Sequence, residues 1–175
     1  MKENFIINPE QKLLLLASRI SFSEENQNQI SECISAPNFN WFEFFKLALY
    51  HKTFTLCWAN IHRLLPSVII PKYLNEIAQY TYFKICQKNE MYIREVSMIL
   101  DELKKKGVIV IPVKGMMLLP LIYKDLGIRY NGDADFLVRY DDINRMELAL
   151  HELGYLKGFY NPETNKIEKI SWHVL

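Results

Sequence analysis

The sequence has little of several features that mark particular protein classes. Only 3 of its 175 residues are cysteines, and none forms a C-x-x-C pair. This argues against a disulfide framework and favours a reduced compartment. No apolar run approaches the roughly 20 residues that span a bilayer. The first residues also lack the basic start, long apolar stretch and cleavage site of a signal peptide. We therefore expect a cytoplasmic protein with no membrane partner.

A dominant charge of one sign is also missing. The chain carries 21 basic and 20 acidic residues, for a formal net charge of +1. Because no strong overall field attracts phosphate backbones, a small molecule or a protein is favoured over nucleic acid as a partner. By contrast, hydrophobic residues make up 50% of the sequence and charged residues 23%. These shares are typical of a globular protein with a substantial core.

The first 106 residues read almost entirely as helix. Asn8-Pro9-Glu10-Gln11 has the cap, first-turn proline and capping-box partner of a helix start. The signal repeats at Ser21-Phe22-Ser23-Glu24, and Asn40-Trp41-Phe42-Glu43 opens a third helix. A long helical pattern then runs from Pro71 to Lys106. Gly107 is the residue expected just past its end. We predict a helical domain over residues 1–106.

The pattern changes after Gly107. Short strands are predicted over 108–113 and 134–139, with a short helix over 115–122 between them. A second helix runs to Leu153, and residues 155–160 and 166–174 form a hairpin. This order predicts an α+β protein, in which an N-terminal helical bundle precedes a small mixed-sheet α/β core over residues 107–175.

The stretch "RYNGDADFLV", residues 129–138, places two carboxylates just before an apolar run. In a strand, Asp133 and Asp135 project to the same face. Two such carboxylates can share a divalent cation, and Mg²⁺ takes one or two of them together with substrate phosphates and water. The alternative is that both are turn residues after Gly132.

A lysine and a glycine stand where the first predicted strand meets its helix, in "VIVIPVKGMMLL". Backbone N–H groups at a helix start attract phosphate, and Gly115 would let it approach closely. Lys114 would add a positive charge. The spacing of a P-loop is absent.

The order of these pieces resembles a known family. The segment "VKGMMLLPLIYKDLGIRYNGDADFLV" is similar to the uncharacterised nucleotidyltransferases of the DNA polymerase β-like superfamily. The resemblance implies that an acceptor hydroxyl attacks the α-phosphorus of a nucleoside triphosphate and gains a nucleoside monophosphate. Asp133 and Asp135 would be catalytic and would hold Mg²⁺ or Mn²⁺. Lys114, Gly115 and Arg129 would bind the substrate.

The resemblance also implies a third catalytic carboxylate, and at that position this sequence departs from the pattern of the family. The family has an acid two residues before a histidine, whereas Ser171 stands two before His173. Glu168 is the nearest carboxylate and becomes the candidate third catalytic acid. The third acid is then lost, displaced to Glu168, or supplied by a partner chain or a second copy. The chain would be a truncated, split or shortened member, with its core cut short at the C-terminus.

Three functions stay open at this point. The first is a metal-dependent nucleotidyltransferase with an unknown hydroxyl acceptor. The second is a catalytically inactive module of the same fold that binds nucleotide or a protein partner. The third is a helical interaction protein whose C-terminal α/β unit is structural.

Overall fold

The structure is a computed structural model, and it describes residues 7–168. By its internal contacts the chain forms two compact units. The first contains Met1–Met91 and Met117–Gly132, and the second contains Tyr92–Met116 and Asp133–Leu175. Each unit consists of two separate segments, and along the sequence the segments of one unit alternate with those of the other. The domain boundary that the sequence predicts after residue 106 stays a prediction.

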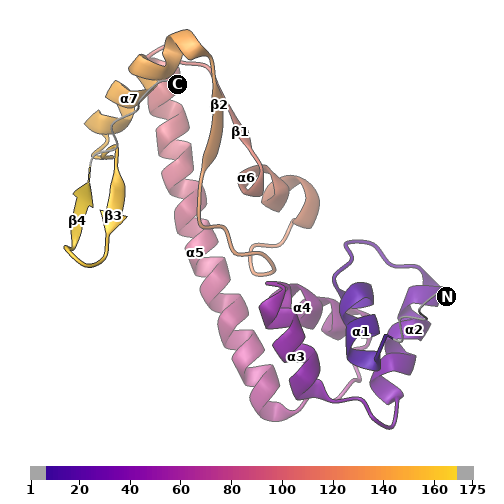
Figure 1. Ribbon diagram of the computed structural model, residues 1–175. Coiled ribbons are helices and arrows are strands. Elements are labelled where there is room, and N and C mark those ends of the chain that lie inside the picture. Colours follow the sequence, from indigo (N-terminus) through magenta and orange to yellow (C-terminus); the bar gives the residue numbers. More distant parts are fainter. Residues whose placement is uncertain (1–6, 169–175) are drawn as a thin grey trace, which may run out of the picture. The chain divides into compact units, whose positions relative to one another are not determined.

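Four helices and the first part of a fifth build the first unit (Figure 1). They are α1 (Pro9–Ala17), α2 (Glu24–Ser35), α3 (Trp41–Tyr50), α4 (Phe54–Leu64) and α5 (Lys72–Lys105). Asn8 forms the predicted capping box with Gln11. In the predicted stretch 21–24 the capping residue is Ser23, and its box partner is Asn26, so the second helix begins two residues later than a box from Ser21 to Glu24 implies.

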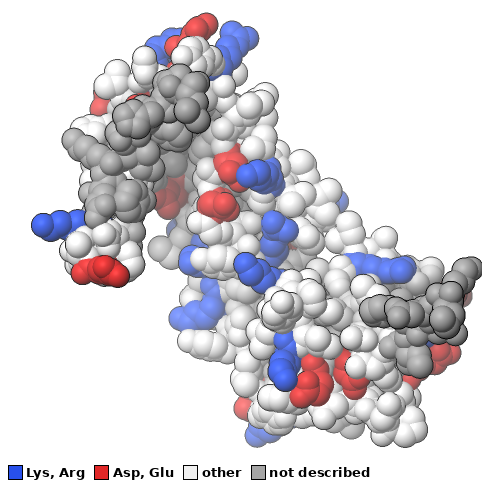
Figure 2. Space-filling view, in the orientation of Figure 1, with Lys and Arg blue, Asp and Glu red and all other residues white. Residues whose placement is uncertain are grey.

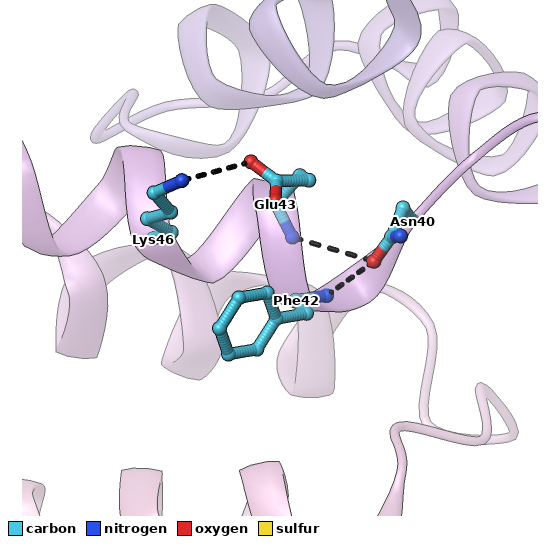
Figure 3. A network of polar contacts seen from close by, with 4 residues as sticks. All are labelled: Asn40, Phe42, Glu43 and Lys46. Carbon is cyan, nitrogen blue, oxygen red and sulfur yellow. Dashed lines mark hydrogen bonds and ion pairs between the residues drawn. The ribbon is translucent and has the colours of Figure 1, made fainter.

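At the start of α3, Asn40 Oδ1 accepts from the backbone N–H groups of Phe42 and Glu43, at 2.9 and 3.3 Å (Figure 3). These caps satisfy N–H groups that have no partner within the helix.

The core of the first unit is aromatic at its centre. Phe44 and Phe45 on α3 are fully or almost fully buried, and their rings lie 5.1 Å apart. The ring of Phe54 meets Phe45 edge-on at 5.0 Å. Leu13, Ile30 and other apolar side chains of α1, α2, α4 and α5 complete this cluster. The aromatic stripe of α3 therefore forms the centre of a helical bundle, as its helical spacing predicts.

Helix α5 is the longest element, with 34 residues. It ends where the sequence predicts. Gly107 has a φ of +66°, its N–H bonds to the carbonyl of Lys104, and the N–H of Val108 bonds to that of Leu103. Glycine adopts this left-handed conformation without steric cost, so it ends the helix and turns the chain toward the first strand.

The second unit carries the strands: β1 (Val110–Val113), β2 (Asp135–Val138), β3 (Phe159–Asn161) and β4 (Lys166–Glu168). Helix α6 (Gly115–Leu118) begins at the end of a segment of this unit, and the π-helical turn that follows it, Leu119–Tyr123, belongs to the first unit. Helix α7 (Ile143–Glu152) follows a 3-10 turn. β1 pairs with β2 and β3 with β4, both antiparallel. The predicted α+β class is confirmed, and the pairings described within residues 7–168 are both antiparallel.

A small core joins the elements of the second unit. Ile99 and Leu103 from α5, Val108 from the segment before β1, and Ala149 from α7 are buried together. Val110, Phe136 and Val138 cover this cluster from one face of the β1–β2 sheet. The sheet therefore rests on the C-terminal part of α5. Among the described helices, none combines the length and the apolar character needed to cross a membrane.

Candidate functional site

The end of β1 and the start of β2 bring two predicted site residues together. Val113 lies opposite Asp135 in the antiparallel register, so the next residue, Lys114, stands beside that carboxylate. Lys114 Nζ lies 3.2 Å from Asp135 Oδ1, and the two side chains are 73% and 31% exposed. An exposed pair of this kind stabilises a fold by about 0–1 kcal/mol. The lysine can therefore exchange this contact for another partner at little cost.

The backbone at Lys114 has an unusual conformation. Its φ of +55° lies in the left-handed region, which costs a residue with a side chain about 1 kcal/mol. The strain lies at the junction where β1 ends and Gly115 opens α6, a helix of only four residues. Backbone strain is concentrated at functional positions, so the conformation agrees with a role for the lysine.

The two acidic residues lie at the entrance to β2. The strand begins at Asp135, one residue later than predicted, so Asp133 lies in the irregular segment before it. The alternation of side chains in a strand, from which we expected the two carboxylates to share a face, therefore does not extend to Asp133. Tyr92 on α5 donates its hydroxyl hydrogen to the backbone carbonyl of Asp133. Burial raises the pKa of Tyr92, and the charges of Asp133, Asp135 and Glu95 raise it further. The negative charges of both aspartates therefore oppose ionisation of the same tyrosine hydroxyl.

The donor set fits a metal ion that is held jointly with a substrate. Among the side chains that the structure describes, no three histidine, cysteine, aspartate or glutamate groups gather to hold a metal. The two carboxylates supply hard oxygen ligands, which Mg²⁺ accepts alongside phosphate oxygens and water. A site closed by protein ligands alone does not fit these described side chains.

The predicted third acid is placed by its backbone only. Glu168 is the last residue of β4, and it pairs with Phe159 in the hairpin. The position of its side chain lies outside the part of the chain that the structure describes, as do Ser171 and His173. Glu168 therefore stays a prediction as a catalytic residue.

Arg129 belongs to the first unit, in the loop that follows the π-helical turn. Its guanidinium carbon lies 5.9 Å from the centre of the Tyr123 ring, a cation–π arrangement. The side chain is half-buried, and its Nε atom is buried without a hydrogen-bond acceptor. A buried donor without a partner costs about 1–3 kcal/mol. The packing around Arg129, including the Tyr123 ring, therefore holds its side chain in a position where Nε lacks an acceptor among the described residues.

Residues of α5 fasten this loop, and our sequence interpretation did not single them out as site residues. Asn89 contacts the backbone at Leu126 and Arg129. Tyr82 donates to Asp125 Oδ1 at 2.8 Å, and the same oxygen accepts from the N–H of Gly127 at 2.8 Å. One signal was available in the sequence: Asn89 is a polar residue at helical spacing from Ile85, Tyr92 and Val96, within the apolar face of the long helix.

Among the described residues on the face drawn in Figure 2, the charged side chains form no single-sign patch that would identify a substrate. Figure 2 shows basic and acidic groups scattered among uncharged side chains on the face drawn. The contacts around Asp133 and Asp135 are therefore the more informative feature of the described residues.

Comparison with known proteins agrees with the family resemblance. A family model described as "Uncharacterised nucleotidyltransferase" matches residues 37–173, which is most of the chain and includes every predicted site residue. This match supports a general nucleotidyltransferase role. No curated protein and no solved structure matches the chain.

Proposed function

Because the chain belongs to the uncharacterised nucleotidyltransferase family, we propose that it is a metal-dependent enzyme that transfers a nucleoside monophosphate from a nucleoside triphosphate to a hydroxyl acceptor. The observation that carries the proposal is the grouping at the β1–β2 sheet. There, Asp135 and Lys114 are in contact, and Tyr92 donates a hydrogen bond to the backbone carbonyl of Asp133. A carboxylate pair beside a lysine suits a substrate that carries phosphates and a divalent cation.

Asp133 and Asp135 would hold the cation, Mg²⁺ or Mn²⁺. When bound, such an ion neutralises phosphate charge and stabilises the attacking and leaving oxygens of an in-line displacement. Asp135 already accepts a cationic group, the ammonium of Lys114, at 3.2 Å. The long and exposed lysine side chain can turn from the carboxylate to a phosphate oxygen of the bound triphosphate. This exchange would leave the carboxylate free for the cation.

The remaining residues would position the substrate. Gly115 would let a phosphate approach the backbone beside Lys114, and Arg129 would bind phosphate oxygens through its guanidinium fork. The role of Arg129 rests on the family resemblance. In the reaction, the acceptor oxygen forms a bond to the α-phosphorus, and the bond from that phosphorus to the β-phosphate oxygen breaks. Pyrophosphate leaves, and Glu168 is our proposed acceptor of the hydroxyl proton.

A second candidate function is a module of the same fold that binds nucleotide without transferring it. Two observations favour this candidate. Asp135 is ion-paired with Lys114, and Ser171 stands where the family has an acid. If Glu168 does not serve as the third acid, a partner chain or a second copy of this chain would have to supply it.

Thermal unfolding with and without triphosphate and Mg²⁺ tests the metal role. A ligand present at 100 times its dissociation constant stabilises a protein by about 2.7 kcal/mol. We expect wild type to show Mg²⁺-dependent stabilisation, and Asp135→Asn to lose it because the amide is a poor ligand for Mg²⁺. Asp101→Asn is the matched control, since Asp101 is exposed on α5 in the same unit. Equal stabilisation of Asp135→Asn and wild type would overturn the metal role.

Transfer of label separates the two candidate functions. Each of the four α-labelled triphosphates is incubated with the protein and Mg²⁺ or Mn²⁺, alone and with a cell extract. Label that becomes attached to the protein or to an extract component supports the enzyme. Binding without transfer of label from any triphosphate supports the module.

A further inference from the structure

Asn89 lies at the centre of a set of hydrogen bonds between α5 and the loop that precedes the acidic pair. Its side chain is fully buried. Nδ2 donates to the backbone carbonyls of Leu126 and Arg129, both at 2.7 Å. Oδ1 accepts from the backbone N–H of Asn131 at 3.4 Å. One carboxamide thus contacts three backbone groups within six residues of the loop.

The chemistry of these contacts requires an amide. Two carbonyl oxygens need a donor with two hydrogens, and one N–H needs an acceptor in the same plane. A carboxylate of the same shape offers only acceptors, so it would face the two carbonyls without a hydrogen between them. An apolar side chain of the same size would leave all three backbone groups unsatisfied.

The loop needs this restraint because it contains buried donors without acceptors in the described part of the chain and has no regular secondary structure. Arg129 Nε and Asn131 Nδ2 are buried donors without acceptors among the described residues. Gly127 is buried, and a Cβ atom there would lie 2.3 Å from the Tyr82 ring. The segment from Lys124 to Ala134 has no helix or strand. Its conformation therefore depends on the bonds from α5, to which the loop adds the bond between the Gly127 N–H and Asp125 Oδ1.

We propose that Asn89 is a positioning residue for nucleoside triphosphate binding: it holds residues 126–131 in the conformation that presents Arg129 to the phosphates. The proposal rests on the proposed function, since it takes Arg129 as a phosphate ligand. Asn89 itself touches no substrate and acts through the backbone carbonyl of Arg129. Its effect is therefore on the affinity for triphosphate, with the overall fold retained.

The test compares Asn89→Asp with Asn75→Asp. Both make the same chemical change on α5, but Asn75 uses its Oδ1 as an acceptor for Trp58 and His62, a role that aspartate keeps. At pH 8 we expect Asn89→Asp to weaken binding of Mg²⁺-triphosphate by about tenfold or more, as the loss of hydrogen bonds to a buried group implies. Asn75→Asp should bind as wild type does.

The pH profile separates positioning from a general loss of packing. Burial raises the pKa of a carboxyl group, and the protonated form can donate to one of the two carbonyls. The ratio of the Asn89→Asp to the wild-type dissociation constant should therefore fall as the pH is lowered from 8 to 5.5. The triphosphate and the charged groups around the loop, Asp125, Glu90 and Lys88, are the same in both proteins, so their effects cancel in the ratio. A ratio that is the same at both pH values would overturn the proposal.

Hydrogen exchange distinguishes a failure of this proposal from a failure of the proposed function. We expect faster exchange over residues 124–132 in Asn89→Asp, with exchange in α3 and α4 unchanged. Unchanged exchange in the loop would overturn the positioning role whatever the binding result. Faster exchange with unchanged affinity would overturn it too and leave the proposed function standing. If wild type binds no triphosphate, both proposals fail. Asn89→Ser, which keeps one small donor, replaces Asn89→Asp if the latter does not fold.

Discussion

Glu10 is an almost fully buried carboxylate in the helical bundle, and it accepts a hydrogen bond from the backbone N–H of Asn40 at 2.7 Å. Asn60 is also buried, and it donates to the backbone carbonyls of Ala17 and Arg19. Asn89 does the same for the loop before the acidic pair. Glu10 bonds to the backbone where α3 begins, Asn60 bonds to it where α1 ends, and Asn89 bonds to it in a loop without regular structure. Buried polar residues therefore fasten the irregular segments of this protein, as the need to pair buried backbone groups requires.

Such residues are hard to identify from sequence. The acidic pair and Lys114 can be singled out from the sequence, because the spacing of neighbouring residues is enough to suggest a cation site and a phosphate contact. The role of Asn89 depends on three backbone groups about 40 residues away, which no local pattern encodes. The same holds for the left-handed backbone of Lys114, because lysine has no preference for that conformation.

Cys57 offers a test of burial at a single position. It is fully buried in α4, and burial raises the pKa of its thiol from 9.0 to about 11, against the opposing effect of hydrogen bonds with Thr53 and Ser18. The unfolded chain therefore loses this proton at lower pH than the folded chain does. The stabilisation from Cys57 is complete below pH 9 and is lost as the pH rises through about 11.

Alkylation followed by mass spectrometry measures this shift. At pH 8.5 we expect Cys57 to react at least about 75-fold more slowly in the native protein than in urea, because a pKa of about 11 instead of 9.0 lowers the thiolate fraction to that extent at this pH. The native rate should increase up to pH 11. Equal rates in the native and unfolded protein at pH 8.5 would show that the thiol is accessible.

Among the elements, the helices followed from the sequence more closely than the strands did. Asn8 and Asn40 cap helices as predicted, Ser23 caps α2 within the stretch predicted to open it, and Gly107 ends the longest helix. These signals are local, since a cap acts on backbone groups two or three residues away. The strand predicted over 108–113 begins only at Val110, and the one predicted over 134–139 covers Asp135–Val138. Strand ends depend on pairing with a distant segment, so sequence alone places them less well.

The loop from Lys124 to Ala134 yields a prediction at the scale of the element. Gly127→Ala places a Cβ atom 2.3 Å from the Tyr82 ring, which must move and release its hydrogen bond to Asp125. We expect a loss of about 1–3 kcal/mol in the free energy of unfolding, the usual effect of overpacking. Chemical denaturation measures it.

Gly132→Ala is the matched control in the same loop. A Cβ atom at Gly132 would meet the ring of Tyr130 at 3.2 Å, and Tyr130 is an exposed side chain that can move aside. Its effect should be well below that of Gly127→Ala. Similar losses for the two variants would show that the contact with Tyr82 is not what requires glycine at position 127.

At the scale of the whole molecule, the sequence predicts the two kinds of structure but not how their segments group. Composition changes at Gly107, and this change indicates a helical part and an α/β part. The compact units instead exchange segments, because residues 117–132 group with the first unit and residues 92–116 with the second. The bonds of Asn89 and Tyr82 to the loop produce the first grouping, and the packing of Ile99 and Leu103 produces the second. Both depend on long-range contacts.

The two units have separate cores of unequal size, so we expect them to unfold separately. The first core contains a large set of buried side chains from five helices, whereas the second has Ile99, Leu103, Val108 and Ala149 at its centre. The two clusters share no residue. Because burial of apolar surface is the main stabilising contribution, the second unit should open at the lower free energy.

Paired core variants test this independence by hydrogen exchange. Phe45 and Leu103 are each 1% exposed, one in each cluster. Phe45→Ala and Leu103→Ala should each cost about 2–5 kcal/mol, but we expect each to speed exchange only in its own unit: α3 and α4 for Phe45→Ala, and α7 with the C-terminal part of α5 for Leu103→Ala. Because α5 runs through both units as one helix, coupling along it is the competing outcome. Faster exchange in both units after Leu103→Ala alone would show that the protein unfolds as a single cooperative structure.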